Sequence, residues 1–399
     1  MFNTVQASSQ WHRFCSVLIV SQSGNTAYVD SVGEYGSSTY VGAHIKFETT
    51  AWLTTMPKHV HVTIYNPDKQ TFTEAKSEGA LIVVLAGYLG SARGSIVDLT
   101  LLLKSIFSES LVPKIGSAPP GASAYLTRAE MQMQVDEITN AYNDAYPDNN
   151  IGPIFYGEIS QAYIGRENAT DTFLKINAVD AAEFHRNGFV AVSVPAGTTD
   201  LGAMRTISAS TRQDLVTNHL ITYNVNEIDT NELPDKGIVS ERGTVYFGQN
   251  TRVMRKLAAN NGADYYVVNN TPTLLARSQF LNSKAIVCNR DTGMIGMPQQ
   301  TISGIIVRML MNPLIQQGMM LQLNSNDILL AEQDVSYQGV RTNELLSPIF
   351  QTAVGNYKIL SVTHVCDSRG QDWYSHIVCF MPQHTPIDAA QYNQDYIKY

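Results

Sequence analysis

Residues 155–180 read FYGEISQAYIGRENATDTFLKINAVD, and residues 357–382 read YKILSVTHVCDSRGQDWYSHIVCFMP. Both stretches are rich in Val, Ile, Tyr and Phe on either side of a polar segment that contains Asp. This composition is typical of two β-strands joined by a turn. Each stretch is therefore predicted to form a long β-hairpin with a polar tip.

The residues that precede each hairpin also follow a common plan. HVTIYNP at 61–67 and IIVRMLMNP at 305–313 each predict a strand that ends in Asn-Pro, because proline cannot donate to a sheet ladder and asparagine favours a turn. A Gly-marked turn and a second strand then follow, ALIVVLAGY at 80–88 and MMLQLN at 319–324. The chain is thus expected to contain one β-module twice, which suggests a shape used twice and not a catalytic pocket.

The residues between the two copies, and an insertion in the first copy, predict helices as well as strands. TRVMRKLAANNG at 251–262 predicts a helix that ends at Asn-Gly, and the residues after it predict a hairpin with its turn at Asn269–Pro272. Residues 91–150 break the strand pattern of the first copy. Helices are predicted there at 95–107 and after Thr127, the second with an apolar stripe at Met131, Val135, Ile138 and Tyr142.

With 399 residues, the chain has room for two or three domains. The expected fold is α+β and mainly β, with two related barrel-like β domains flanking a small α/β domain. We expect the first barrel-like domain at 1–190 with a helical insertion at 91–150, and the small α/β domain at 191–277. The second barrel-like domain is expected at 278–385, followed by a C-terminal tail at 386–399.

Composition excludes several classes of protein. Charged residues make up 16% of the chain, below the usual quarter, which suggests surfaces covered by partners. The net charge of −8 and the scattered Lys and Arg argue against a nucleic-acid-binding face. No apolar run reaches the roughly 18 residues of a membrane span, and the N-terminus does not read as a secretory signal. The 4 cysteines form no CxxC pair and are expected to be free, buried thiols in a reducing cytoplasm.

Several long strings resemble the tail or baseplate hub proteins of tailed bacteriophages. They are IYNP at 64–67, GEISQAYIGRENATDTFLKINAVDA at 157–181, the stretch from NSKAIVCNRDTG to GMMLQL at 282–323, and GNYKILSVTHVCDSRGQDWYSHIVCF at 355–380. The strings are long and collinear, and the resemblance is weakest over 91–150.

The resemblance implies a structural virion protein. Such hubs carry two barrel-like domains in one chain and assemble as homotrimers, so that six similar positions surround one axis. The expected partners are a tail tube or distal tail protein, a spike or tail-tip protein and a tape-measure protein, with DNA present in transit through the lumen. An acidic wall would let phosphate pass without binding. The resemblance places the protein in the virion tail or baseplate, assembled in the host cytoplasm.

No residue is predicted to be catalytic, cofactor-binding or metal-binding. The chain contains no Gly-x-Ser-x-Gly, His-Glu-x-x-His or Walker motif. Two histidine pairs, His59 with His61 and His364 with His376, lack an evident third ligand for a metal. The residues Asp144, Asp148 and Asn149 lack the spacing of a calcium loop and predict a plain turn.

Two alternative functions stay open at this point. A tail-associated cell-wall hydrolase would need paired carboxylates such as Glu158 and Asp180 in a cleft. A host carbohydrate-binding tail module would need exposed aromatics, for which 3 tryptophans (Trp11, Trp52 and Trp373) are few but 20 tyrosines leave room. The pliable string GMIGMPQQT at 293–301 is expected either to dock a neighbouring subunit or to lead into the second barrel-like domain.

Overall fold

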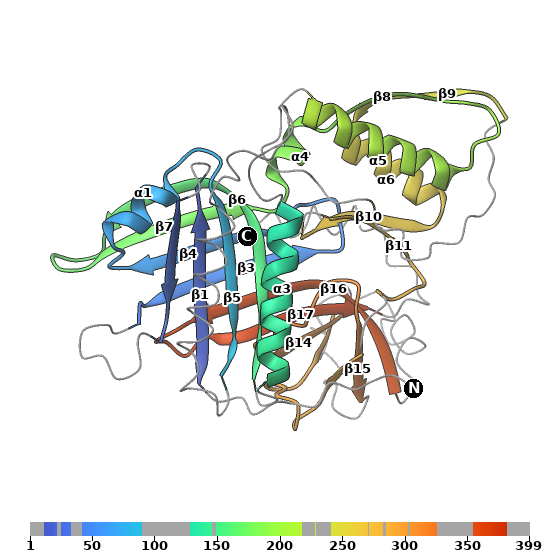
Figure 1. Ribbon diagram of the computed structural model, residues 1–399. Coiled ribbons are helices and arrows are strands. Elements are labelled where there is room, and N and C mark those ends of the chain that lie inside the picture. The colour runs from blue at the N-terminus through green and yellow to red at the C-terminus, as the bar shows by residue number, and fades with distance from the viewer. Residues whose placement is uncertain are drawn as a thin grey trace, which may run out of the picture.

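The computed structural model describes the residue ranges 12–21, 25–32, 42–89, 128–145, 149–217, 228, 241–269, 271–281, 285–301, 304–324 and 354–380. A large mixed sheet of 13 strands forms the body, and a smaller unit of helices and short strands lies beside it (Figure 1). The described part of the protein is therefore mainly β, as the sequence predicts.

Two sets of strands build the large sheet. The first module consists of β1 (Arg13–Val20), β2 (Thr26–Asp30), β3 (Ile45–Trp52), β4 (His59–Tyr65), β5 (Leu81–Tyr88), β6 (Asn150–Arg166) and β7 (Thr172–Val179). The second module consists of β12 (Ile286–Cys288), β13 (Gln299–Thr301), β14 (Gly304–Leu310), β15 (Met320–Asn324), β16 (Val354–Asp367) and β17 (Trp373–Phe380). The predicted long hairpins are β6–β7 and β16–β17.

The two modules share one strand order. In the first, β4, β7, β6 and β5 are neighbours in that order, and in the second β14, β17, β16 and β15 are neighbours in the same order, with every pair antiparallel. Each long hairpin has a register shift at the same place, between Ile159 and Gln161 and between Ile359 and Ser361. The common plan read from the sequence is therefore present in the strand pairing.

The turns before the second strands are also equivalent. Gly79 and Gly318 adopt φ angles of +66° and +85°, a region that glycine enters without the steric cost of a side chain. The amide of Ile159 then donates to the carbonyl of Ala80, and the amide of Ile359 donates to that of Met319. A left-handed glycine thus brings each second strand back to the start of the long hairpin.

The two modules are joined edge to edge. Strand β3 of the first pairs antiparallel with the C-terminal half of β16 in the second, from Trp52 opposite Ser361 to Lys46 opposite Asp367. The strand path among the described residues runs from β13 to β2 and does not close on itself. The large sheet is therefore open, and barrel closure of either module stays a prediction.

Strand β5 is the centre of the first module, with all eight residues buried. Ile82 and Val84 face the core shared by both modules, whereas Leu81 and Val83 face a second core. Helix α3 (Arg128–Ala145) covers that second core with Val135, Ile138 and Tyr142, and Figure 1 shows it running alongside the sheet. Both faces of the apolar strand at 80–88 are covered, as its sequence predicts.

The predicted helical insertion is described in part. Helix α3 confirms the helix expected after Thr127, although the side chain of Met131 and the helix predicted at 95–107 lie outside the described residues. One further short helix, α1 (Lys69–Ala75), follows the Asn66-Pro67 turn and is capped by the Asp68 side chain.

The small unit contains α4 (Ala182–Asn187), β8 (Phe189–Val194), α5 (Asp200–Thr217), β9 (Thr244–Gln249), α6 (Asn250–Asn260), β10 (Ala263–Val268) and β11 (Thr271–Ala276). Helices α5 and α6 pack beneath the β8–β9 ribbon (Figure 1), around a core that includes Met204 and Met254. The helix predicted at 251–262 and the hairpin after it are confirmed as α6 and β10–β11, with Asn269 left-handed at the hairpin turn.

Candidate functional site

The histidine pair on β4 shares a face of that strand. The His59 and His61 rings lie 5.5 Å apart between centroids, and His61 Nδ1 is 2.8 Å from the side-chain oxygen of Asn177. Partial burial lowers the pKa of His59, and the neighbouring His61 lowers it further. In the described part of the chain, no group of three or more His, Cys, Asp or Glu residues is arranged to hold a metal.

The second histidine pair is not brought together. His364 and His376 lie on adjacent strands, but His364 is opposite Ser375 and His376 is opposite Thr363, so the two rings point to opposite faces of the sheet. His364 is buried, and its Nδ1 lies 2.8 Å from Ser375 Oγ. Burial lowers the pKa of His364 to about 3, with a smaller contribution from Lys58. His364 is thus a neutral core residue.

The carboxylate pair weighed for glycan cleavage is inside the protein. Asp180 is fully buried and Glu158 is 8% exposed. Lys58 is buried beside them, and its Nζ donates to the carbonyl of Ile154. Desolvation lowers the pKa of Lys58 to about 8, while the charge of Asp180 acts in the opposite direction. Neither carboxylate is therefore open to a polysaccharide.

The remaining candidates are also structural or lie elsewhere. Asp144 is exposed near the end of α3, Asn149 is buried, and Asp148 is outside the described residues. Among the tryptophans, Trp373 is buried and packs edge-on to Tyr88, and Trp11 is outside the described residues. The four cysteines are free and buried, as expected.

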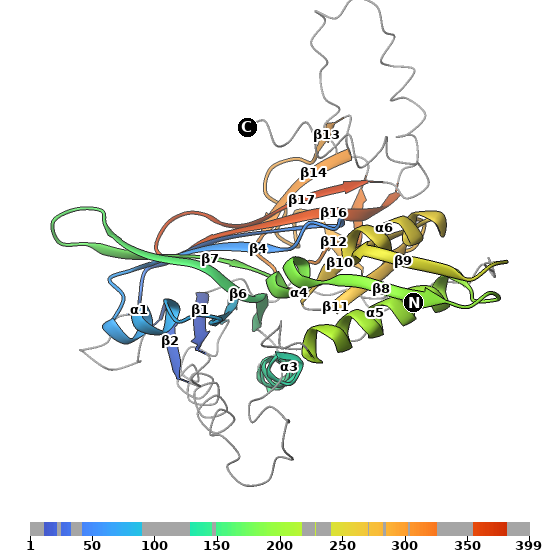
Figure 2. The ribbon, with the colours of Figure 1, turned by 90° about the horizontal axis from the view of Figure 1, so that it is seen from above.

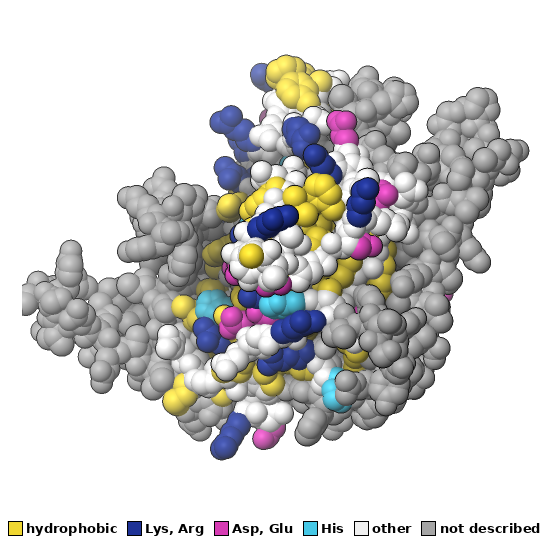
Figure 3. Space-filling view, turned by 90° about the vertical axis from the view of Figure 1, so that its left-hand side faces the viewer, with side chains coloured by type: hydrophobic (Ala, Val, Ile, Leu, Met, Phe, Trp, Pro, Cys, Tyr) yellow, Lys and Arg dark blue, Asp and Glu magenta, His cyan; other side chains and the backbone are white. Residues whose placement is uncertain are grey.

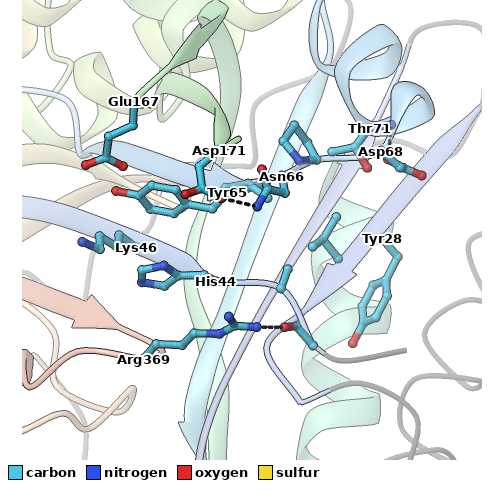
Figure 4. Close-up of a pocket in the computed structure, with 15 residues that line it drawn as sticks. Tyr28, His44, Lys46, Tyr65, Asn66, Asp68, Thr71, Glu167, Asp171 and Arg369 are labelled. Atoms are coloured by element: carbon cyan, nitrogen blue, oxygen red, sulfur yellow. Dashed lines mark hydrogen bonds between the residues drawn. The ribbon is translucent and has the colours of Figure 1, made fainter. Parts of the chain in front are cut away.

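A polar pocket lies where the tips of the two long hairpins approach the start of β3. Its volume is about 610 Å³, and Figure 4 shows its lining side chains. They come from β2, β3, the end of β4, α1 and both hairpin tips, and include Tyr28, His44, Lys46, Tyr65, Asn66, Asp68, Glu167, Asp171 and Arg369. Sequence reasoning singled out the Asp-containing tips and the Asn-Pro turn separately, but it did not predict that they meet.

Asp367 organises one side of this pocket. Its carboxylate is 2.7 Å from His44 Nε2 and 3.2 Å from Lys46 Nζ, and it accepts the backbone amides of Arg369 and Gly370. Partial burial alone would raise the pKa of Asp367, but these hydrogen bonds outweigh it and lower the pKa to about 2. The tip of the second hairpin is therefore held against the start of β3 by an ionised carboxylate.

Asn66 organises the other side. It has a left-handed backbone with φ of +50°, and its side-chain amide donates to Asp171 while its oxygen accepts the amide of Thr172. Hydrogen bonds from Asn168 and Asn66 lower the pKa of Asp171. The Asn-Pro turn thus ends β4, as its sequence predicts, and also fixes the tip of the first hairpin, a contact that the sequence did not predict.

The pocket contains charged side chains of both signs, and its cations are held by an ion pair, a backbone carbonyl and an aromatic ring. Arg369 donates to the carbonyl of Gly42, and Lys46 lies over the Tyr65 ring. Figure 3 shows acidic, basic and histidine side chains intermixed on the face of the molecule seen from the left of Figure 1. This arrangement suits a polar contact surface better than a reaction centre, because none of the described lining residues is a nucleophile held by a base.

A second surface is apolar. The outward face of the β8–β9 ribbon exposes Phe189, Val245 and Phe247, the last with 74% of its surface accessible, and the two phenylalanine rings stack edge-on at 4.8 Å. Exposed apolar side chains that gather on one face are typical of a protein contact. No helix among the described residues has the length and apolar character to cross a bilayer.

Comparison with known proteins identifies the class of molecule. Residues 122–328 match the family described as Baseplate hub gp41, and no curated protein matches the chain. The structure is similar to the tail protein from Neisseria meningitidis MC58, with a TM-score of 0.46 and 8% identity over 92% of this chain and 96% of that one.

It is also similar to the 43 kDa tail protein of prophage MuSo2 from Shewanella oneidensis, with a TM-score of 0.47 and 6% identity over 92% of this chain and 98% of that one. A third similar structure is the Francisella PdpA-VgrG complex, with a TM-score of 0.44 and 7% identity over 94% of this chain and 54% of that one. Because the family match spans more than half of the sequence, the chain belongs to the baseplate hub gp41 family.

Proposed function

We propose that three copies of this chain form a ring that joins a six-fold tail tube to a three-fold spike or tail tip. Family membership makes the protein a structural component of a bacteriophage tail baseplate. The observation that carries the finer proposal is the common strand order of the two modules. Three chains with two such modules each would present six similar surfaces around one axis, which is the requirement for matching six-fold to three-fold symmetry.

The partners follow from that geometry. One face of the ring would contact a tail tube or distal tail protein, and the opposite face would contact a spike or tail-tip protein. DNA and a tape-measure protein would pass through the lumen, and the net charge of −8 is consistent with a wall to which phosphate does not adhere. The hub would be assembled in the host cytoplasm and remain in the virion tail.

The proposed division of the chain follows the ranges predicted from the sequence except at one boundary, because α4 and the start of β8 belong to the small unit. The modules would occupy about 1–181 and 278–385 as barrel-like domains, the small α/β domain about 182–277 and the tail 386–399. The separate core of the small unit, around Met204 and Met254, supports an independent middle domain.

We propose no catalytic role for the chain. Glu158 and Asp180, the pair considered as an example of hydrolase carboxylates, are buried. Burial of Trp373 weakens the carbohydrate-binding alternative. A zymogram against peptidoglycan checks this directly, and a cleared band at the mass of the chain would contradict it.

The oligomeric state tests the central proposal. Light scattering on the purified full-length chain is expected to give the mass of a trimer, and electron microscopy of the same sample to give a ring with three-fold symmetry. A chain that remains monomeric at high concentration would refute the proposal, because a hub ring is an obligate assembly with an interface on the order of 2,000 Å² or more.

A further inference from the structure

The internal duplication allows the two modules to be aligned residue by residue through their strand pairing. Next to the register shift of each long hairpin, a row of laterally paired residues, here called a rung, crosses the module from strand to strand. In the first module the rung on β6, β7, β4 and β3 is Ile159, Ala178, Val60 and Thr49. In the second, the rung on β16, β17, β14 and β13 is Ile359, Cys379, Ile305 and Gln300.

This alignment makes β13 the counterpart of β3. Strand β3 lies beside β4 and β13 lies beside β14, the two strands that end in Asn-Pro, and each pairs antiparallel with its neighbour. Strand β3, however, uses its other edge to pair with β16, whereas no described strand pairs with the other edge of β13. The pairing with β14 continues upstream of β13, because Met294 bridges to Met309 and the amide of Ile295 donates to the carbonyl of Arg308, so the counterpart of β3 includes the string GMIGMPQQT.

The C-terminal halves of β6 and β16 show the complementary difference. The half of β16 from Ser361 to Asp367 pairs with β17 on one side and β3 on the other. The half of β6 from Gln161 to Arg166 pairs with β7 on one side, and no described strand pairs with its other edge. In Figures 1 and 2 this part of β6 and β7 projects from the body as an arm.

Side-chain exposure follows the same asymmetry. Ile164 of β6 is 48% exposed, whereas His364, its counterpart on β16, is 4% exposed. Tyr163 on the arm is 42% exposed, and Ile295 and Met297 on the segment before β13 are 37% and 52% exposed. Apolar side chains beside an unpaired strand edge promote aggregation unless a partner strand covers that edge.

We propose that the free edge of β13 in one copy of the chain pairs antiparallel with the free edge of β6 in the next copy, as β3 pairs with β16 inside one chain. This inference rests on the proposed ring and names its subunit contact. The seam inside the chain sets the register, because Thr50 is opposite Thr363 and Thr49 is opposite His364. The intersubunit seam would therefore place Thr301 opposite Tyr163 and Gln300 opposite Ile164 of the neighbour.

The structure indicates that the partner of each free edge is a second copy of this chain. One free edge belongs to each module, and Figure 2 shows β13 and the projecting β6–β7 arm well apart on the molecule. Contacts between different patches on identical chains form a closed ring when the rotation closes. Around such a ring, the β3–β16 seam within a chain would alternate with the β13–β6 seam between chains.

Disulfide formation at the predicted register tests the pairing. The variant Tyr163→Cys/Thr301→Cys is expected to form covalent dimers and trimers on mild oxidation, seen on non-reducing gels. The matched control Thr50→Cys/Thr363→Cys places cysteines where two side-chain oxygens lie 3.3 Å apart, and it should cross-link within one chain. The off-register control Glu167→Cys/Thr301→Cys moves one cysteine about 13 Å along the arm, to the residue after β6, too far for a disulfide.

A surface substitution gives an independent readout. Ile164→Lys is expected to raise the concentration at which half of the chain is assembled by about tenfold or more. The control Met56→Lys, at a 43% exposed position between β3 and β4, should leave it unchanged. If the wild-type chain is a trimer but the predicted cysteine pair cross-links no better than the off-register pair, the seam is refuted and the ring survives. If the wild-type chain is a monomer, both proposals fail.

Discussion

The Oγ1 atoms of Thr50 and Thr363 lie 3.3 Å apart across the seam between β3 and β16. This contact joins residues from opposite ends of the chain, and the seam around it turns two copies of a β-module into one continuous sheet. Trp373 of the second module is part of the core of the first. The modules therefore cannot separate without exposing a strand edge and a shared apolar core.

Lys358 makes the stability of the protein depend on pH. The side chain is completely buried, and its Nζ donates to the carbonyl of Ala276 at the end of β11, so it ties the small unit to the second module. Burial lowers the pKa of Lys358 from 10.5 to about 8, and the charge of Asp264 opposes this change. The unfolded chain therefore binds more protons than the folded chain between these two values, and stability rises with pH across that interval.

The variant Lys358→Met should lack this contribution. We expect the free energy of unfolding of the wild type to increase relative to the variant by on the order of 2 kcal/mol between pH 7 and pH 10. Urea unfolding at both pH values measures it. A constant difference between the two proteins across this range would show that Lys358 does not lose its proton in the folded state.

Asp367 should also make stability rise with pH, but in a lower pH range. Its pKa is lowered from 3.8 to about 2 in the folded protein, so its contribution is present above pH 4 and is lost as the pH falls toward 2. Asp367→Asn is expected to cost about 1–2 kcal/mol at pH 7, since His44 and Lys46 lose their ionised partner.

The difference in free energy of unfolding between wild type and Asp367→Asn should therefore be smaller at pH 3 than at pH 7. Chemical denaturation at both pH values measures it. Asp171→Asn is the comparison on the other hairpin tip, where the carboxylate accepts from the neutral amides of Asn66 and Asn168 and a small effect is expected. An equal loss in both variants would mean that the attachment of Asp367 to the start of β3 adds nothing.

Gly318 is expected to tolerate no side chain. Its φ is +85°, and a Cβ there would lie 2.9 Å from the side chain of Leu275. Gly197 has nearly the same φ, +87°, but a Cβ there would meet nothing within 4 Å. Both Gly→Ala variants bear the cost of a left-handed backbone, so the difference between them isolates the steric clash with β11.

We expect Gly318→Ala to be less stable than Gly197→Ala by about 1–2 kcal/mol. Thermal unfolding of the two variants provides the comparison. Equal midpoints would indicate that Leu275 moves aside without cost and that the small unit is loosely packed against the second module.

Local features of this protein were readable from its sequence because they depend on residues close together in the chain. The Asn66-Pro67 turn, the left-handed Gly318 and the apolar strand around Val84 each have a direct steric or hydrophobic reason. The duplication was readable for the same cause, since each module repeats its own local pattern of strands and turns.

Tertiary structure alone decided how the two copies meet. Nothing in the sequence near Lys46 or Thr50 indicates pairing with β16, because register between distant strands is set by packing across the whole sheet. The same holds for the polar pocket, which gathers Asn66, Asp171 and Arg369 from three separate segments. Sequence thus determined the repeated unit, and long-range strand pairing determined that one of its edges is covered within the chain while the described strands leave the equivalent edge uncovered.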